Sequence, residues 1–473
     1  MDIKVGIYRQ DKKGYPKKSP YLPCCIFEEY PFDDKRTDGT NEVYSSLRRL
    51  LKLLDLDAEN FNTKRWNPLG SIIRPGETVL LKPNLVKHFN EQGDIRSLIT
   101  HGSLIRAVTD YVYIALKGNG RIIIADGPMD DADFEKVVLI SGMDRIRRFY
   151  KDTAGFDLEI YDLRRERVIK ENEKIIRRIK LKGDPLGYTV VDLGNMSEFK
   201  KPNGDRTMSC PYSALRGSEC RADIMSLHHN AEKDEYLISN TFLKADVVIN
   251  LPKMKTHKRS GVTLSLKNLV GVTGDRNWLP HYSDDNCGCG HKTDPGKTFP
   301  GIIKNTVKYI KPLRDSLRQF VGVTKETMRS GNWYGNDIIW RTVLDLWRIG
   351  SYADKNGVIR KDKQRKSFVI VDGITGGEGD GPLNPRPKKS NVLIAGIDEA
   401  VVDIVTSRIM GFDPFKIPLL RRFLPAPDIN CVSNVKAWNR KLSDFKGRCL
   451  NFKPHYGWKR HIEAGSGVKK QDL

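Results

Sequence analysis

Short apolar runs alternate along this chain with stretches whose apolar residues recur at helical spacing. Each run is almost continuously apolar and stops at a polar or glycine-containing turn. This pattern is typical of strands that are buried on both faces of a parallel sheet. We expect strands at residues 3–8, 78–81, 121–125, 245–251, 368–371 and 391–395.

Helical patterns fill the intervals between these runs. Thr100 is the expected N-cap of one helix, and Gly411 followed by Pro414 marks the end of another. The alternation of strands and helices predicts an α/β protein with a mainly parallel sheet and flanking helices. The expected helices are 44–54, 104–116, 302–320, 338–349 and 399–410.

Two stretches lack this rhythm and are rich in charge, glycine, proline and asparagine. We interpret them as insertions into the α/β core, and the basic C-terminal part as an extension. The predicted organisation is a first part of the core at 1–129, a peripheral insertion at 130–240, a core segment at 241–274, a second insertion at 275–366, completion of the core at 367–425 and the extension at 426–473.

The turns that follow the predicted strands carry polar chemistry. In an open α/β sheet, ligands bind beyond the carboxyl ends of the strands, so these turns are the natural place for a site. The turns are Lys82-Pro83-Asn84, Asp126-Gly127-Pro128, the segment 252–257, and Asp372-Gly373 with the glycine-rich run 376–382.

One of these turns concentrates basic groups. Lys253, Lys255 and His257 alternate along it and would point to one side of an extended chain, while Lys267 and Asn268 follow a short predicted helix. Three convergent nitrogen groups could bind a phosphate or carboxylate, or perform acid–base chemistry. The alternative is an exposed basic loop.

Carboxylates come from the second half of the chain. Asp372 ends a strand, Glu378 and Asp380 lie in the glycine-rich run, and Asp403 lies on a helix one turn after Glu399. Such oxygen ligands suit Mg²⁺ or Ca²⁺. The alternative for the start of that helix is simple capping and dipole stabilisation.

A second metal candidate combines Cys287, Cys289 and His291, with His281 as a fourth ligand. Zinc sites usually contain C-x-x-C, so a loop with unpaired thiols is the alternative. The cysteine spacing of an iron–sulfur cluster is absent. The run 290–298 misses the spacing of a phosphate-binding loop. The residues therefore specify no cofactor, and a divalent metal is the one group that they suggest.

The overall charge favours anionic partners. Lys and Arg number 81 against 59 Asp and Glu, a net charge of +22 over 473 residues. Such a surface attracts small anions or nucleic acid, although no helix-turn-helix, RNA-recognition or zinc-finger signature is present. No apolar run is long enough for a membrane span. Eight scattered cysteines indicate a reducing cytoplasm.

Several blocks taken together resemble the family catalogued as domain of unknown function 362. They are Lys82 to Val86, Thr100-His101, Ala245 to His257, Gly261 to Gly271, Glu378 to Pro382 and Asp398 to Asp403. The chain is similar to a longer branch of that family, without its iron–sulfur domain. The resemblance implies an α/β fold and a shared site, and it implies no particular reaction.

We therefore expect an enzyme that acts on a small phosphorylated, carboxylated or nucleotide-linked anion. The alternatives are a nucleic-acid-binding protein and a metal or redox protein built on Cys287, Cys289 and His291; the oligomeric state is left open. The expected acid–base residues are His257, His101 and Lys255. The expected substrate-binding residues are Lys82, Asn84, Lys253, Lys267, Asn268, Glu378 and Asp380, with Asp372 and Asp403 as metal candidates.

Overall fold

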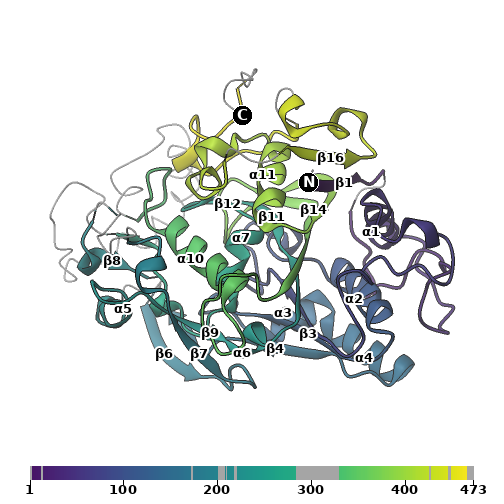
Figure 1. Cartoon of the computed structure of the whole chain (residues 1–473), viewed down its shortest axis with the longest axis horizontal. Coiled ribbons are helices and arrows are strands. Elements are labelled where there is room, and N and C mark those ends of the chain that lie inside the picture. Colours follow the sequence, from purple (N-terminus) through teal and green to yellow (C-terminus); the bar gives the residue numbers. More distant parts are fainter. Residues whose placement is uncertain are drawn as a thin grey trace.

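A mainly parallel sheet forms the centre of the protein (Figure 1). The computed structural model describes residues 3–11, 14–171, 174–200, 208, 210–217, 221–283, 330–424, 428–445 and 449–465. The helix expected at 302–320 lies outside these residues. Across the sheet the strands are, in order, β16 (Ile429–Ser433), β1 (Ile3–Arg9), β15 (Arg386–Gly396), β14 (Lys366–Glu378), β10 (Val247–Leu251), β2 (Thr78–Pro83), β3 (Arg121–Asp126) and β4 (Glu159–Asp162).

The strands from β14 to β4 all run in one direction, and only β15 opposes its neighbours. The carboxyl ends of β14, β10, β2 and β3 therefore lie along one edge of the sheet, as predicted. We call this the carboxyl edge and the opposite edge the amino edge. Two further strands, β11 (Lys253–His257) and β12 (Gly261–Thr263), extend the sheet here, because β11 pairs with the second half of β14.

Both faces of the sheet are buried under helices, which explains the continuous apolar runs. In register, Val79, Ile122 and Val247 face one core, while Leu80, Ile123 and Val248 face the other. In Figure 1 the two helical layers lie on opposite sides of the strands. One layer contains α1 (Glu42–Leu53), α2 (Gly102–Leu116), α3 (Phe134–Ser141) and α4 (Met143–Ala154); the other contains α7 (Ser265–Asn268), α10 (Ile339–Tyr352), α11 (Glu399–Met410) and α12 (Pro418–Arg421).

The helix ends follow local chemistry, with one correction. Gly411 ends α11 with φ 97°, and Asp398 caps its start by accepting from two backbone N–H groups. The cap of α2, however, is His101 and not Thr100. The Thr100 hydroxyl instead accepts from the backbone N–H of Asn84 and donates to the carbonyl of Leu251, so it joins two strand ends.

Smaller pairs of strands lie outside the main sheet. β5 (Glu166–Glu171) and β6 (Lys174–Lys180) form an antiparallel pair. β4 and β16, which lie in the segments set apart as insertion and extension, join the main sheet. The other elements are β7 (Tyr188–Asp192) paired with β9 (Glu235–Ser239), β8 (Leu215–Arg216) paired with β13 (Tyr282–Ser283), α5 (Ala222–His228) and α6 (Asn240–Leu243). Within the described ranges, no helix is long and apolar enough to cross a membrane.

Candidate functional site

A cavity of about 240 Å³ opens at the carboxyl edge of the sheet, and we call it the carboxyl-edge cavity. Its walls come from segments that follow β2, β3, β11 and β14, which is why residues far apart in sequence meet there. Two histidines, two arginines and two lysines are among its lining. The polar and charged residues that line it are Asn84, Asp126, His257, Lys258, Arg259, Thr263, Lys267, Asn268, Arg276 and His281.

Lys267 is the exceptional group in this cavity. The short helix α7 carries it, and its side chain is buried. Its ammonium group has no hydrogen-bond or ion-pair partner among the described residues. Burial and the positive charges of Arg276 and Arg259 lower the pKa of Lys267 to about 7. The cavity therefore contains a lysine that lacks the negative partner a buried cation normally has.

Both neighbouring arginines are held by the protein. Arg276 donates to the carbonyl of Gly127 at 2.7 Å, and its Nε lies 3.5 Å from the carboxylate of Asp130. Arg259 donates from Nε to the carbonyl of Ser330 and stacks over Tyr282, 4.5 Å from the ring centroid. Guanidinium groups oriented in this way are suited to carboxylates and phosphates.

The two histidines of the cavity have opposite tautomers. His257 Nδ1 accepts from the backbone N–H groups of Arg259 and Ser260, so the neutral ring carries its hydrogen on Nε2. His281 Nδ1 lies 2.7 Å from the carbonyl of Leu279 and must donate to it, which leaves Nε2 as a lone pair. Burial, followed by the charge of Lys267, lowers the pKa of each histidine well below its ordinary value. One ring thus offers a donor and the other a base.

A chain of asparagines leaves one acceptor in the cavity wall without a partner. Asn268 donates from Nδ2 to the carbonyl of Lys82 and to Asn250 Oδ1, so its own Oδ1 must be the atom that faces Asn84. Asn84 consequently donates its amide to Asn268, and Asn84 Oδ1 is buried without a partner. Thr263 Oγ1 is buried and unpartnered as well. A ligand with hydrogen-bond donors would satisfy both atoms.

Lys82 lies beneath the cavity and does not line it. Its Nζ, fully buried, is 2.6 Å from Asp126 Oδ1 and also donates to the carbonyl of Pro83. Gly271 covers this pair closely: a Cβ at that position would lie 2.0 Å from the Asp126 carboxylate. In this structure Lys82 therefore orients Asp126 and Asn268 and does not reach the cavity, and its role in substrate binding stays a prediction.

A second buried cluster takes up three of the predicted site residues. Lys253 Nζ lies 3.1 Å from Asp372 and donates to Tyr15 Oη, which in turn donates to the same carboxylate at 2.6 Å. The backbone N–H of His101 donates to Asp372, and its ring stacks on Tyr15 with centroids 4.0 Å apart. Lys255 lies on β11 between Lys253 and His257, and it donates to the carbonyl of Leu98 at 2.7 Å. These side chains therefore have partners inside the protein and line no part of the carboxyl-edge cavity.

The remaining carboxylates also have structural partners. Asp403 accepts from the backbone N–H groups of Ser265 and Leu266, and so holds the start of α7. Glu378 accepts from the backbone N–H of Lys453, and Asp380 lies 3.5 Å from the ring of His455. None of these three carboxylates lines the cavity.

The sequence suggested two metal sites, one built on carboxylates and one on cysteines and histidines. Asp372 and Asp403 are engaged as described, and His281 lies in the cavity. Cys287, Cys289 and His291 lie outside the described residues, so their proposed cluster stays a prediction. Within the part of the chain that the structure describes, no group of three or more His, Cys, Asp or Glu side chains is arranged to hold a metal.

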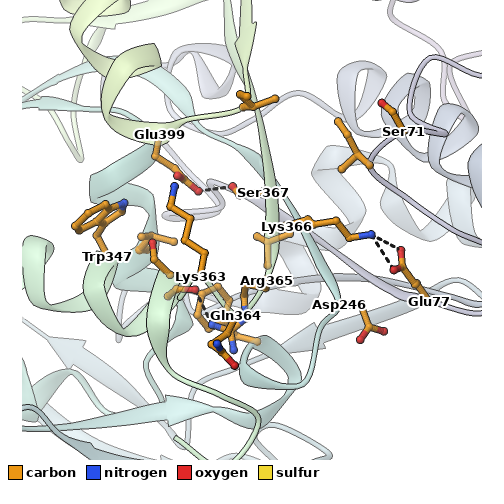
Figure 2. Close-up of a pocket in the computed structure, with 17 residues that line it drawn as sticks. Ser71, Glu77, Asp246, Trp347, Lys363, Gln364, Arg365, Lys366, Ser367 and Glu399 are labelled. Atoms are coloured by element: carbon orange, nitrogen blue, oxygen red, sulfur yellow. Dashed lines mark hydrogen bonds and ion pairs between the residues drawn. The ribbon is translucent and has the colours of Figure 1, made fainter. Parts of the chain in front are cut away.

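A larger cavity of about 610 Å³ lies at the opposite edge of the sheet (Figure 2), and we call it the amino-edge cavity. Glu77, Asp246 and Lys366 contribute to it from the starts of β2, β10 and β14. Lys366 and Asp246 are ion-paired there, whereas two buried donors, Arg365 Nε and Trp347 Nε1, have no partner among the described residues. Figure 2 shows Lys366 bound to Glu77, at 2.8 Å, and Ser367 bound to Glu399.

The architecture and the position of the cationic cavity define an α/β protein with a candidate ligand site beyond the strand ends. Residues 79–192 and 211–408 match the model of the family described as Domain of unknown function (DUF362). Because this match covers more than half of the chain, the protein belongs to that family.

Comparisons with curated proteins and with solved structures gave further matches, among them the following two. A thylakoid-associated protein of Synechocystis is 21% identical over 355 residues, which cover 74% of this chain and 68% of that protein. A crystal structure of a protein from Thermotoga maritima is 11% identical, with a TM-score of 0.29 over 75% of this chain. The chain spans 56% of the length of that second protein.

Sequence reasoning missed several functional groups. Arg276 and Thr263 were not selected, because Thr263 ends β12, a strand that the sequence analysis did not predict, and Arg276 follows no predicted strand. Tyr15 carries no motif at all, and only the fold brings it to Asp372. A usable signal did exist for Asp126, since it ends a predicted strand in the same way as Lys82.

Proposed function

We propose that this protein is an enzyme that acts on a small anionic substrate bound in the carboxyl-edge cavity. The observation that carries the proposal is the unpartnered ammonium group of Lys267 between two oriented arginines. A buried excess of positive charge is unfavourable in the empty protein, and an anion would relieve it. Phosphorylated and carboxylated molecules both have the required charge.

The two histidines supply the acid–base chemistry in this proposal. The Nε2 lone pair of His281 accepts a proton from the substrate, and His257 Nε2–H donates a hydrogen bond to it. Both rings are neutral at pH 7, because burial and Lys267 lower the pKa of each. Asn84 Oδ1 and Thr263 Oγ1 would recognise hydroxyl or amine groups of the substrate.

We propose the same compartment and partner that the sequence predicted, namely the cytoplasm and a small anionic substrate. Among the described cysteines, Cys24, Cys25, Cys431 and Cys449 are free thiols, which supports a reducing compartment. A small-molecule substrate is preferred over nucleic acid, because the unpaired cation lies inside a cavity of about 240 Å³ and not on an open surface.

Thermal unfolding with added anions tests the proposal. Phosphate or sulfate should raise the melting temperature of the wild type, and added chloride should weaken the rise. Lys267→Met should abolish most of this response. Lys366→Met, which removes a lysine from the amino-edge cavity, should keep it. An equal response in all three proteins would contradict the anion site, and a metabolite-binding screen would follow a positive result.

A further inference from the structure

Among the buried lysines of the carboxyl edge, Lys267 alone has a free amine in a cavity, as far as the described residues go. Lys82 and Lys253 are ion-paired, and Lys255 donates to a main-chain carbonyl. None of these three lines the cavity, whereas Lys267 does. The same position that makes Lys267 an anion-binding group also exposes its nitrogen to a bound molecule.

We propose that Lys267 is a nucleophile that forms an imine with the carbonyl group of a small oxo acid. The inference rests on the anion site proposed above and names its substrate class. Arg259 and Arg276 would bind the carboxylate of the oxo acid and so place its carbonyl carbon at Lys267 Nζ.

The electrostatics of the cavity favour this chemistry. An amine attacks a carbonyl only when it is unprotonated, and lysines become nucleophiles when they are desolvated or lie beside other cations. Lys267 meets both conditions, since burial and its two arginine neighbours hold its pKa at about 7. A large share of the molecules therefore has a neutral amine at neutral pH.

The step balances without an oxidant or a metal. The lone pair of Nζ attacks the carbonyl carbon, the C=O π electrons move to the oxygen, and one nitrogen proton is transferred to that oxygen to give a carbinolamine. The second nitrogen proton is then transferred to the hydroxyl group, the C–O bond breaks and water leaves, which gives the neutral imine. His281 lines the same cavity, and the lone pair on its Nε2 is the available proton acceptor for these transfers.

Reductive trapping tests the inference on the full chain without knowledge of the natural substrate. The protein is incubated with pyruvate and sodium cyanoborohydride at pH 7.5, digested, and mapped by mass spectrometry. Hydride transfer to the imine carbon would leave a stable carboxyethyl group on the lysine. We expect Lys267 to be modified ahead of the exposed lysines, and sulfate to suppress the reaction by competition.

Two variants control for charge and for general lysine reactivity. Lys267→Arg keeps the charge and removes the amine, so it should lose the adduct. Lys366→Arg, in the amino-edge cavity, should retain it. The peptide map of the wild type identifies the site even where a variant fails to fold.

The outcomes separate this inference from the anion site. If pyruvate labels only exposed lysines while phosphate still raises the melting temperature through Lys267, the imine inference is overturned and the anion site stands. If neither labelling nor a Lys267-dependent thermal response is seen, both proposals fail.

Discussion

The two cavities lie at opposite edges of one sheet and differ in how their charges are balanced. The amino-edge cavity is the larger, at about 610 Å³ against about 240 Å³. There Lys366 pairs with Glu77, Asp246 with Lys355, and Ser367 donates to the buried Glu399. At the carboxyl edge Lys267 has no partner within the described part of the chain.

We therefore prefer the carboxyl-edge cavity as the candidate site on the balance of its charges and not on its size. Folding should leave few buried polar atoms without partners, because each costs free energy. Within the described part of the chain, both cavities nevertheless contain two such atoms, Asn84 Oδ1 and Thr263 Oγ1 at the carboxyl edge and Arg365 Nε and Trp347 Nε1 at the amino edge. The carboxyl-edge cavity adds Lys267, a buried cation with no hydrogen-bond partner among the described residues. A bound ligand is the simplest compensation. The parallel strands determine which edge receives it, since their carboxyl ends carry the long connecting loops.

The largest contrast should appear when one lysine is removed from each edge. Lys82→Met leaves the buried carboxylate of Asp126 without its cation, and we expect a loss of about 3–5 kcal/mol in the free energy of unfolding. Lys366→Met breaks a partly exposed ion pair and should cost at most about 1 kcal/mol. Urea unfolding measures both. Equal costs would show that the ion pair of Lys82 and Asp126 is not buried from solvent as the structure has it.

A second contrast concerns pH. The pKa of Lys267 is about 7 in the folded protein against 10.5 for an ordinary lysine, so between these values only the unfolded chain binds the proton. The free energy of unfolding contributed by this group therefore rises with pH in that window, by about 1.4 kcal/mol per unit. Wild type should gain this stability relative to Lys267→Met between pH 7.5 and 9.5.

Two checks sharpen the pH experiment. Phosphate should flatten the difference, because a bound anion favours the charged lysine. Lys366→Met should follow the wild-type profile, as its lysine lies at the other edge. Parallel profiles for wild type and Lys267→Met would mean that Lys267 titrates normally in the folded protein.

The smallest contrast compares two hydroxyl groups. Thr263→Val removes a hydroxyl that has no partner, so in the absence of ligand it should be neutral or stabilising by less than about 1 kcal/mol. Ser367→Ala removes the donor to Glu399 and should destabilise by about 1–2 kcal/mol. Thermal and urea unfolding without added anions measure the two. A clear loss for Thr263→Val would indicate a partner for its hydroxyl in solution.

Much of the fold could be predicted, because a strand that is buried on both faces has a continuous run of apolar residues in the sequence. The runs at 78–81, 121–125 and 245–251 became β2, β3 and β10 with nearly the predicted bounds. The capping role of Asp398 and the end of α11 at Gly411 could also be predicted from the sequence, since both depend on neighbouring residues. By contrast, Thr100 looked like a cap, and its hydroxyl instead joins Asn84 to Leu251, residues that only the folded chain brings near it.

The candidate site could be predicted only in part from the sequence. Asn84 and His257 were predicted from loops after strands, and Lys267 and Asn268 from their place after a short predicted helix. The structure places all four around one cavity. Lys82 and Lys253 came from the same kind of loop, yet they are paired with Asp126 and Asp372. Sequence spacing cannot distinguish these outcomes, because the partner carboxylates lie on other strands.

The sequence by itself determined the α/β class and six strands of the main sheet, because hydrophobic periodicity is a property of short segments. Only the tertiary structure decided which cation stays unpaired. That choice depends on which acids the packing brings within a few ångströms, and it places carboxylates beside Lys82 and Lys253 but two arginines beside Lys267. Charge pairing in a buried site is a three-dimensional property, since Coulomb energies and desolvation depend on distance and burial and not on position along the chain.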